Sequence, residues 1–377
     1  MDIHGSFAPG FERVRQTFED NFTERDDVGA CVAVTLEGET VVDLWGGWRD
    51  RAKTLPWRED TIVNVYSTTK TMAALTMLLL ADRGELDLHA PVKKYWPEFA
   101  ANGKEKVELR HFLSHSAGLS GMDEPIVGDD LYDWEKVVTA LARQKPWWEP
   151  GTASGYHALT QGHLIGEVVR RVTGTTLGAF FRRELAEPLG ADFHIGTGPE
   201  HHHRIGELVP PAETPAAEAE KDSIAARTFA NPSVHASASA TAAWRQAEIP
   251  AANGHGNARS VAAVQTLAAN LGVAGGKRLM SEAGCRVIFE EQSFGPDLVL
   301  GVPLRFGMGY GLTTELLPMG PNEHIAYWGG WGGSTAVVDQ DARLCVSYVM
   351  NRMEGNLLGD LRGFKLLQAA YRSLNPR

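Results

Sequence analysis

Strand-like sequence lies at both ends of this chain, and helix-like sequence fills the stretch between them. Near the N-terminus, residues 30–36 and 40–45 are apolar and β-branched, and the break at 37–39 predicts a hairpin. Four more strand-like runs follow near the C-terminus, at 306–317, 324–328, 335–339 and 344–350. We therefore expect one sheet built from both ends of the chain, with a helical insertion between its halves.

Helical patterns occupy most of the remaining sequence. They are found at residues 11–22, 109–115, 134–143, 158–172, 177–185, 260–270 and 357–374. Residues 67–83 are apolar on all sides, which predicts a buried helix that ends at Gly84 and follows a short extended segment at 61–66. Residues 192–250 show little periodicity and predict a long irregular segment of the kind that often lines a site.

Length and charge limit the architecture and the partners. A chain of 377 residues usually exceeds one small core. We expect a sheet domain from residues 1–66 and 258–377, and a mostly helical domain from 67–257. The chain has 47 acidic and 36 basic residues, a net charge of −11. This charge argues against binding to nucleic acid or to an anionic membrane surface, because both carry negative charge.

Apolar runs and cysteines bear on the cellular compartment. The longest apolar run, 71–81, is too short to span a bilayer, and the first twenty residues lack the apolar centre of a signal peptide. Cys31, Cys285 and Cys345 are too few for a disulfide framework. Cys31 and Cys345 lie in apolar strand-like runs, and we interpret them as buried thiols. These features predict a cytoplasmic protein.

The first candidate for chemistry is Ser67-Thr68-Thr69-Lys70, at the junction of the extended segment and the apolar helix. Residues three apart share a helix face, so the Lys70 amine can reach the Ser67 hydroxyl. The Ser67 amide is free at a helix start, and apolar surroundings favour the neutral amine that a base requires. The motif predicts an activated nucleophile. A helix-capping serine beside a solvated lysine is the alternative.

The second candidate is Tyr156, which follows a predicted loop between Gly151 and Gly155 and lies just before a predicted helix. A phenol serves as base or acid when cationic neighbours lower its pKa, and Lys70 is expected to be that neighbour. The two groups would then titrate as one coupled pair. The alternative is a tyrosine that packs on the following helix.

The third candidate is Trp328-Gly329-Gly330-Trp331, inside a strand-like run. Glycines in a strand let another group approach the backbone closely. A strand edge beside the nucleophile could supply the second amide of an oxyanion hole, from Trp331. A tight turn or a bulge is the alternative.

Together the three motifs resemble those of the serine β-lactamase and penicillin-binding-protein superfamily, and most closely the class C-like family VIII carboxylesterases. Ser67-Thr68-Thr69-Lys70 matches the Ser-x-x-Lys element, and Tyr156-His157-Ala158 matches the Tyr-x-x element. Trp328-Gly329-Gly330 stands where lactamases carry Lys-Thr-Gly and where these esterases often carry Trp-Gly-Gly. Residues 113–119 and 250–257 add supporting matches. Three motifs in the right order are far more specific than one.

The resemblance implies an α+β fold of the β-lactamase/transpeptidase type. An antiparallel sheet would be flanked by terminal helices, and the site would lie between it and a mostly helical domain. The implied chemistry is acyl transfer: Ser67 attacks a carbonyl, and Lys70 and Tyr156 move the protons. Amides of Ser67 and Trp331 would hold the oxyanion. Which of Lys70 and Tyr156 is the primary base stays open, and no cofactor is expected.

Trp328 departs from the lactamase pattern. Lactamases and carboxypeptidases recognise a substrate carboxylate with the lysine of Lys-Thr-Gly, whereas Trp328 offers an apolar face and one indole donor. We expect a small-molecule ester that is neutral and fairly apolar as the substrate, with weak or no activity on β-lactams, although Arg245 could still bind a carboxylate. Substrate contacts are expected from Trp328-Gly329-Gly330-Trp331, His157 and His255. A structural hydrogen bond is the alternative for either histidine.

Other motifs argue against other classes. His201-His202-His203 is interpreted as a solvated loop and not a metal site, because consecutive histidines rarely converge on one ion. The chain has no Gly-x-Ser-x-Gly, which argues against an α/β-hydrolase, and no glycine motif placed to bind a nucleotide. A carboxylesterase is the first hypothesis. The alternatives are an acyltransferase, amidase, D-peptidase or weak β-lactamase with the same site, or a non-catalytic ligand sensor.

Overall fold

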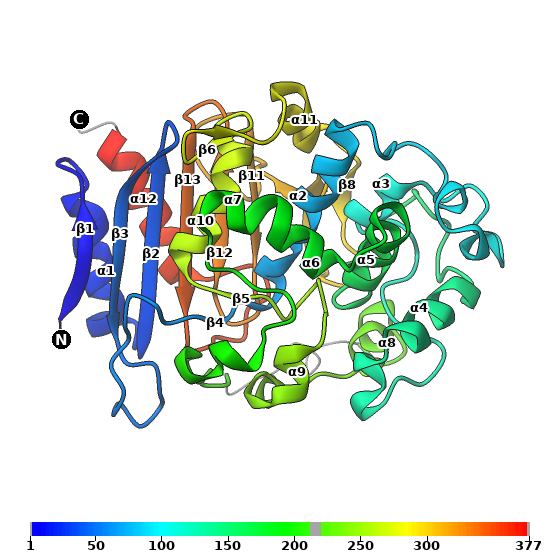
Figure 1. Cartoon of the computed structure of the whole chain (residues 1–377), viewed down its shortest axis with the longest axis horizontal. Coiled ribbons are helices and arrows are strands. Elements are labelled where there is room, and N and C mark those ends of the chain that lie inside the picture. Colours follow the sequence, from blue (N-terminus) through cyan, green and yellow to red (C-terminus); the bar gives the residue numbers. More distant parts are fainter. Residues whose placement is uncertain (1, 212–219, 375–377) are drawn as a thin grey trace.

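The computed structural model describes residues 2–211 and 220–374. Its centre is a nine-stranded antiparallel sheet with the strand order β1-β3-β2-β13-β12-β11-β10-β9-β8 (Figure 1). The strands are β1 (Ile3–Phe7), β2 (Gly29–Leu36), β3 (Glu39–Gly47), β8 (Ser293–Pro296), β9 (Pro303–Phe306), β10 (Gly311–Leu312), β11 (Ile325–Gly329), β12 (Thr335–Asp339) and β13 (Leu344–Met350). Because β2 pairs with β13, both ends of the chain build one sheet, as predicted.

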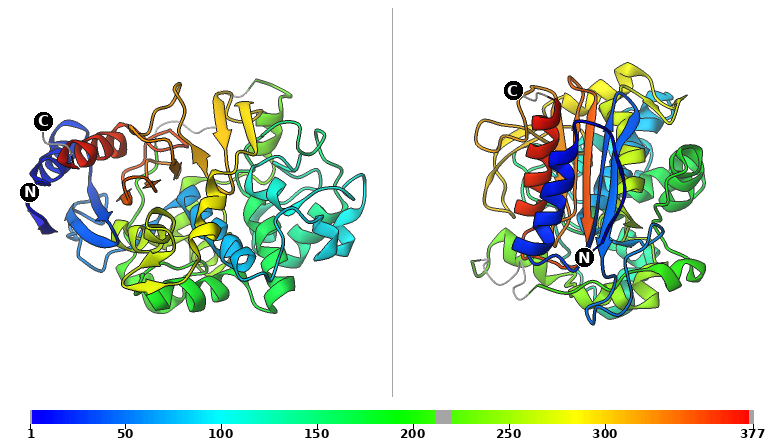
Figure 2. Two further views of the ribbon diagram at one scale, coloured as in Figure 1. Left: turned by 90° about the horizontal axis from the view of Figure 1, so that it is seen from above. Right: turned by 90° about the vertical axis from the view of Figure 1, so that its left-hand side faces the viewer.

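Helices cover both faces of this sheet. They are α1 (Glu12–Glu24), α2 (Thr69–Asp82), α3 (Leu109–Leu113), α4 (Trp134–Arg143), α5 (Thr160–Thr173), α6 (Leu177–Phe181), α7 (Glu187–Leu189), α8 (Ile224–Ala230), α9 (Ala242–Gln246), α10 (Ala258–Ala269), α11 (Glu282–Arg286) and α12 (Leu361–Leu374). The terminal helices α1 and α12 lie side by side on one face, and α10 packs on the other against β2, β12 and β13 (Figure 2). This is the expected α+β fold of the β-lactamase/transpeptidase type.

The predicted hairpin near the N-terminus is confirmed. Glu37 and Gly38 form the turn between β2 and β3, with φ angles of +52° and +91°. Two consecutive residues with positive φ match the right-handed twist of the flanking strands, which keeps the hairpin paired. All but the last residue of β2 are buried because helices cover both faces of the sheet there.

The apolar helix is α2, and it is buried from Thr69 to Leu80. It contacts α5, α6, α10 and α11, so no side of it faces water along most of its length. The helix ends near Gly84, whose φ of +72° suits a residue without a Cβ. Two small sheets flank this region: β4 (Val63–Asn64) pairs with β5 (His255–Gly256), and β6 (Val273–Ala274) with β7 (Lys277–Arg278).

The single strand predicted at 306–317 is wrong. The chain forms β9 and β10 there, separated by a turn that contains Gly309, with a φ of +86°. A Cβ on Gly309 would lie 2.3 Å from the Cβ of Ala74, so this turn packs directly on α2 and interrupts the strand. The edge strands β1 and β8 were not predicted, because their residues are exposed or only partly buried and lack an apolar alternation.

Several other expectations can be compared with the structure. The three cysteine thiols are buried, and burial raises the pKa of each to about 12. In the described parts of 192–250 the longest α-helix is α8, in keeping with an irregular segment. Among the described residues, no helix has the length and apolar character needed to cross a bilayer. The division into two domains and the cytoplasmic location stay predictions.

Candidate active site

Ser67 lies on a short 3-10 turn (Tyr66–Thr68) between β4 and α2. The residue before it, Tyr66, has a φ of +44°, a left-handed conformation that is strained for a bulky side chain. Packing holds this conformation, because the Tyr66 ring contacts the rings of Trp244 and Trp331. The turn thereby presents the Ser67 side chain, which is 7 % exposed, to a pocket.

Lys70 lies at the start of α2, and its amine reaches back to the serine. Its Nζ lies 3.0 Å from Ser67 Oγ, as the spacing of the two residues predicts. The amine also donates to the carbonyls of Ala158 at 2.7 Å and Ala251 at 2.9 Å. The side chain is 2 % exposed, and this burial lowers the pKa of Lys70 well below its ordinary value. The neutral amine is therefore favoured.

Tyr156 comes from the loop before α5 and completes the cluster. Its Oη lies 2.5 Å from Ser67 Oγ, and its ring centre lies 4.7 Å from Lys70 Nζ. The rings of His115 and Trp328 pack against the phenol from the other sides. Burial raises the pKa of Tyr156 above its ordinary value, and the contacts of its hydroxyl with the Ser67 and Trp328 side chains oppose this rise. The phenol therefore stays protonated.

Two backbone amides next to the serine are candidates for binding a negatively charged oxygen. Within the described ranges, neither the Ser67 amide nor the Trp331 amide donates to a protein acceptor. The neighbouring Gly330 amide, in contrast, donates to the carbonyl of Ser334 at 2.8 Å. Ser67 and Trp331 also line the same pocket. The arrangement leaves two N–H donors free beside the nucleophile.

Gly329 and Gly330 let the end of β11 approach the nucleophile turn. A Cβ on Gly330 would lie 2.1 Å from the carbonyl oxygen of Val65, two residues before Ser67. A Cβ on Gly329 would lie 2.4 Å from the amide nitrogen of Gly359. Only glycine permits such close backbone contacts. Neither glycine is among the residues that line the pocket, and both serve backbone packing; their contact with substrate stays a prediction.

The hollow at Ser67, called the catalytic pocket below, has a volume of about 150 Å³. It is lined by Tyr66, Ser67, Tyr156, Ala158, Leu159, Thr228, Phe229, Pro232, Ser233, Val234, His235, Ala252, Trp331 and Leu357. Six of these residues belong to the irregular segment 192–250, as expected for a segment that lines a site. Of the described residues, those that line this pocket include no lysine, arginine or carboxylate.

Three predicted substrate contacts are placed elsewhere. His157 is buried, its Nε2 accepts from the Leu119 amide, and its Nδ1 lies 2.6 Å from a carbonyl oxygen. His255 is also buried, with its Nδ1 3.0 Å from the Thr197 hydroxyl. Neither ring lines the catalytic pocket, and these hydrogen bonds fit the structural alternative; contact of either histidine with substrate stays a prediction. Trp328 lies behind Tyr156 and does not line the pocket either.

One residue that positions the site was not found from the sequence. Asp297 Oδ1 accepts a hydrogen bond from the Tyr156 amide at 3.0 Å. The same oxygen accepts from the amides of Val299 and Leu300, both at 2.9 Å. Asp297 therefore fixes the backbone of the tyrosine. The sequence carried no signal for this role, because an isolated aspartate in a loop says nothing about a partner 141 residues away.

A buried serine held by a lysine one turn later and by a tyrosine from a distant loop, beside an antiparallel sheet with terminal helices, defines a class. It is the class of penicillin-binding proteins and serine β-lactamases, whose members act through a serine nucleophile. Comparisons with known proteins agree. A family model described as Beta-lactamase matches residues 14–371, and the chain belongs to that family.

Individual relatives narrow this assignment. The chain is 36% identical over 376 residues to "Esterase/beta-lactamase LipL" of Mycobacterium tuberculosis (strain ATCC 25618 / H37Rv), covering 96% of this chain and 86% of that protein. A crystal structure of a family VIII carboxylesterase matches with a TM-score of 0.94 and 44% identity, over 99% of this chain and 100% of the other. A penicillin-binding-protein homologue from Caulobacter crescentus matches with a TM-score of 0.93 and 37% identity, over 99% and 100% of the two chains.

Within its superfamily, the chain is a family VIII carboxylesterase. Its resemblance to this family, first drawn from three motifs, is confirmed by a likeness that extends over 99% of the chain. In general terms, the protein is a serine hydrolase of the esterase and β-lactamase type.

Proposed function

We propose that the protein hydrolyses neutral carboxylic esters through a covalent acyl-Ser67 intermediate. The observation that carries this proposal is the meeting of Ser67, Lys70 and Tyr156 at one point. The serine oxygen lies 3.0 Å from the lysine nitrogen and 2.5 Å from the phenol oxygen, at the wall of a pocket. A nucleophile within hydrogen-bond reach of a base is the arrangement that nucleophilic catalysis requires.

In the acylation step, Lys70 acts as the base. A neutral lysine amine has two N–H groups and one lone pair, and the carbonyls of Ala158 and Ala251 can accept from both N–H groups. The lone pair is then directed at Ser67 Oγ and takes its proton as the serine attacks the ester carbonyl.

Tyr156 delivers a proton to the leaving group. Its hydroxyl lies next to Ser67 Oγ, so it can donate to the departing alkoxide and recover a proton from the protonated Lys70 amine. The alcohol leaves, and the acyl group stays on Ser67. A water molecule then attacks the ester bond, gives its proton to the same pair of groups, and the serine recovers a proton as the acid leaves. The amides of Ser67 and Trp331 stabilise the negatively charged oxygen in both steps.

The lining of the catalytic pocket supports a neutral substrate. A substrate carboxylate would be buried without a cation, because neither lysine nor arginine is among the described residues that line the pocket. Penicillins and cephalosporins carry such a carboxylate. The relative LipL is described as an esterase/beta-lactamase, which makes β-lactam hydrolysis the second candidate function. Turnover of p-nitrophenyl butyrate should exceed that of a chromogenic cephalosporin, and the reverse order would contradict the proposed substrate class.

Labelling tests the nucleophile. A fluorophosphonate should add one adduct to the wild-type protein, and peptide mapping should locate it on Ser67. The variant Ser67→Ala should lose both the label and ester turnover while its circular dichroism spectrum stays unchanged. Thr69→Ala is unsuitable as a control because its hydroxyl binds the nucleophile turn. Ser373→Ala, on the last turn of α12, is the control, and it should label and turn over like the wild type. A wild-type protein without label on Ser67 would favour the ligand sensor.

A further inference from the structure

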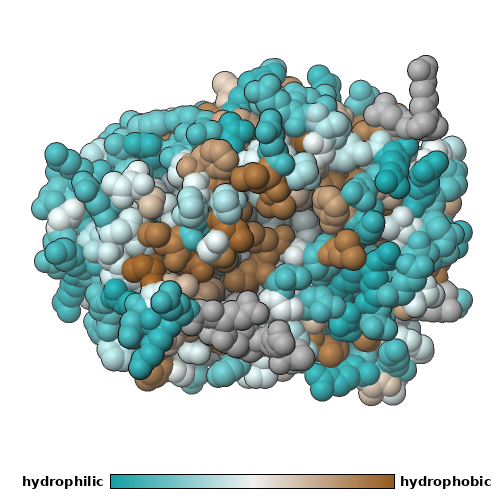
Figure 3. Space-filling view, turned by 180° about the vertical axis from the view of Figure 1, so that it is seen from behind, coloured by the Kyte–Doolittle hydropathy of each residue, from teal (hydrophilic) through white to brown (hydrophobic). Residues whose placement is uncertain are grey.

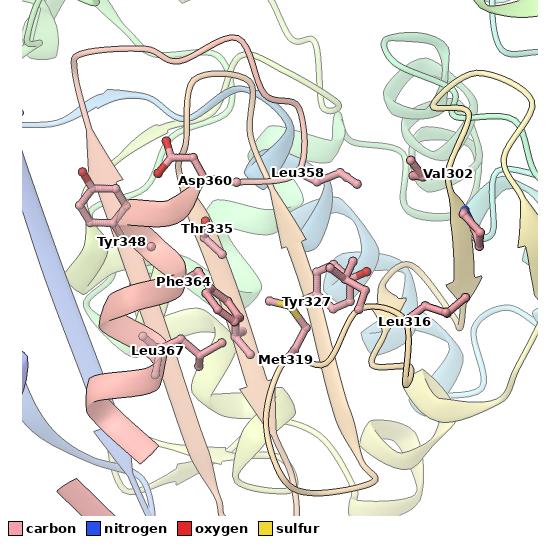
Figure 4. A pocket seen from close by; sticks show the side chains of 16 residues that line it. Val302, Leu316, Met319, Tyr327, Thr335, Tyr348, Leu358, Asp360, Phe364 and Leu367 are labelled. Carbon is pink, nitrogen blue, oxygen red and sulfur yellow. The ribbon is translucent and has the colours of Figure 1, made fainter. Parts of the chain in front are cut away.

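A second and larger cavity lies on the other face of the sheet. It has a volume of about 550 Å³ and lies between α12, the strands β11 to β13 and the loop that carries Leu316 (Figure 4). We call it the sheet-face cavity. Its wall includes Met319, Tyr327, Val337 and Phe364, and most of it is apolar. Nothing in the chemistry at Ser67 accounts for a cavity of this size and character.

The strand alternation of β11 connects this cavity with the active site. Successive side chains of a strand point to opposite faces of a sheet. Trp328 packs against Tyr156 on one face, and its neighbour Tyr327 lines the sheet-face cavity on the other. The same strand therefore contributes a wall to the cavity and a support to the active site.

A third hollow adjoins both spaces. We call it the connecting hollow, and residues 298–302 and 355–359 are among its walls. It shares Phe229 and Leu357 with the catalytic pocket. It shares Val302, Leu358 and Gly359 with the sheet-face cavity. On the face seen from behind, apolar side chains gather around a hollow (Figure 3). The shared walls show that the connecting hollow adjoins both the catalytic pocket and the sheet-face cavity.

The segment 357–359, which lines the connecting hollow, packs on Gly329. Leu357 faces the catalytic pocket, and the next residue, Leu358, lines the sheet-face cavity, where its side chain points toward Val302 (Figure 4). The segment lies directly on β11, since a Cβ on Gly329 would meet the Leu358 carbonyl carbon at 2.4 Å. The position of the path therefore follows from the glycine beside Trp328.

The chemistry of the lining decides what can occupy the cavity. Of the described residues that line it, Asp360 is the one with a charged side chain, and Arg362 binds that carboxylate. A carboxylate or phosphate headgroup would find no cation there, whereas a hydrocarbon chain would be transferred from water to an apolar surface. Exposed leucines at the rim, among them Leu316 at 70 % and Leu317 at 36 %, extend this surface outward.

We propose that the sheet-face cavity binds the unbranched hydrocarbon chain of an ester whose carbonyl lies at Ser67. The chain would run from the catalytic pocket past Phe229 and Leu357, through the connecting hollow, and past Val302 into the cavity. This inference rests on the proposed function and adds a substrate class to it, because it predicts that the enzyme accepts long-chain esters. The chain can belong to the acid or to the alcohol of the ester.

The variant Val302→Trp tests the path at its junction. Val302 is 44 % exposed and belongs to both the connecting hollow and the sheet-face cavity, so a larger side chain there narrows the passage without disturbing the core. The control is Val127→Trp, an identical change at a site that is 68 % exposed and outside all three hollows. Activity is measured as kcat/KM on p-nitrophenyl butyrate and p-nitrophenyl dodecanoate, each at concentrations where the ester is monomeric.

The wild-type protein should hydrolyse both esters. Val302→Trp should lower kcat/KM for the dodecanoate by about tenfold, because two buried methylene contacts are worth about that much, and should leave the butyrate within about twofold. Val127→Trp should change neither. Leu316→Asp places a charge at the rim of the sheet-face cavity alone. It should also lower kcat/KM selectively for the dodecanoate. A second series, hexyl and dodecyl acetate, tests whether the long chain belongs to the alcohol. If Val302→Trp selectively lowers kcat/KM for dodecyl acetate, the alkyl chain of the alcohol occupies the path.

The outcomes separate the two proposals. If the butyrate is hydrolysed and Val302→Trp lowers neither long-chain series selectively, the hydrocarbon path is overturned and the esterase stands. The path is also overturned if the wild type hydrolyses the butyrate but neither the dodecanoate nor dodecyl acetate. If the wild type hydrolyses none of the esters, the proposed function is overturned, and the path with it.

Discussion

At the scale of single residues, burial controls the protonation of the groups beside Ser67. The expectation that a cationic Lys70 lowers the pKa of Tyr156 is wrong. Burial lowers the pKa of the amine and raises that of the phenol, so it favours the neutral form of both groups. A neutral amine is a base and a neutral phenol is an acid. This assignment answers, as a proposal, the question of the primary base that the motifs left open.

The first prediction concerns pH. Because the base is the neutral amine, kcat/KM should fall as the pH drops through the pKa of Lys70, which lies well below the ordinary lysine value. Lys70→Arg should be inactive at every pH, since a guanidinium keeps its proton. The pH profile of p-nitrophenyl butyrate hydrolysis measures both effects. An acid limb that begins only near the ordinary pKa of a lysine would contradict the neutral resting state.

The second prediction concerns the size of each contribution. Lys70→Ala and Tyr156→Phe should each lower kcat by about 10²- to 10⁴-fold, the range typical of positioned acid–base groups. Circular dichroism should show an intact fold in both. Tyr95→Phe removes a hydroxyl that accepts a hydrogen bond from the Asp87 amide far from Ser67, and its kcat should match the wild type. A near-native rate for Tyr156→Phe would remove the phenol from the proton transfer.

At the scale of elements, the end of β11 decides where the nucleophile turn lies. The sequence predicted that the glycines after Trp328 admit a close approach, and the groups that approach them in the fold are backbone segments. Gly330 lies against Val65, and Gly329 lies against residues 358–359. Because Gly329 and Gly330 have no side chains, Val65 and residues 358–359 can pack directly on the end of β11.

The third prediction follows from this contact. Gly330→Ala would place a Cβ 2.1 Å from the Val65 carbonyl oxygen, so the turn that carries Ser67 must shift. We expect kcat to fall by on the order of 10²-fold, as misplacement of a reacting group by about an ångström does. The comparison is Gly84→Ala at the end of α2, where a Cβ meets nothing but φ is +72°. That variant should lose thermal stability and keep its kcat. Equal kcat for both variants would contradict the packing role of Gly330.

At the scale of the whole molecule, a buried ion pair joins the two ends of the chain. Arg362, at the start of α12, donates to Asp27 at 2.6 Å and to Asp360 at 2.6 Å. Tyr348 of β13 also donates to Asp27, at 2.5 Å. Burial raises the pKa of Asp27 to about 6, although the neighbouring Arg362 opposes this rise. The guanidinium is what keeps two buried carboxylates paired.

The fourth prediction tests the contribution of the Arg362 ion pairs to stability. Arg362→Met should lower the free energy of unfolding by about 3–5 kcal/mol, because it leaves two carboxylates buried without their partner. Arg286→Met removes an exposed pair with Glu282 and should cost less than about 1 kcal/mol. Urea unfolding at pH 7, followed by circular dichroism, measures both. Similar losses for the two variants would show that burial adds nothing to the pair at Arg362.

Local sequence pattern was sufficient to predict the helices and strands that other elements cover on both sides. The strands β12 and β13 and the helix α2 were predicted closely, because burial on both sides leaves unbroken apolar runs. The edge strands β1 and β8 were not predicted because their residues are exposed or only partly buried and show no apolar alternation. The spacing of Ser67 and Lys70 was informative because three residues along a helix fix a contact by local geometry alone.

By itself, the sequence determined a sheet built from both ends, a buried helix and a serine–lysine pair at its start. Tertiary structure alone decided the rest: the support of Tyr156 by Asp297, the burial of His157 and His255 away from the pocket, and the cavity behind β11. The physical reason is the range of the interactions. Helix spacing and strand alternation act between near neighbours in sequence, whereas burial, protonation and cavity shape depend on segments that meet only in the folded chain.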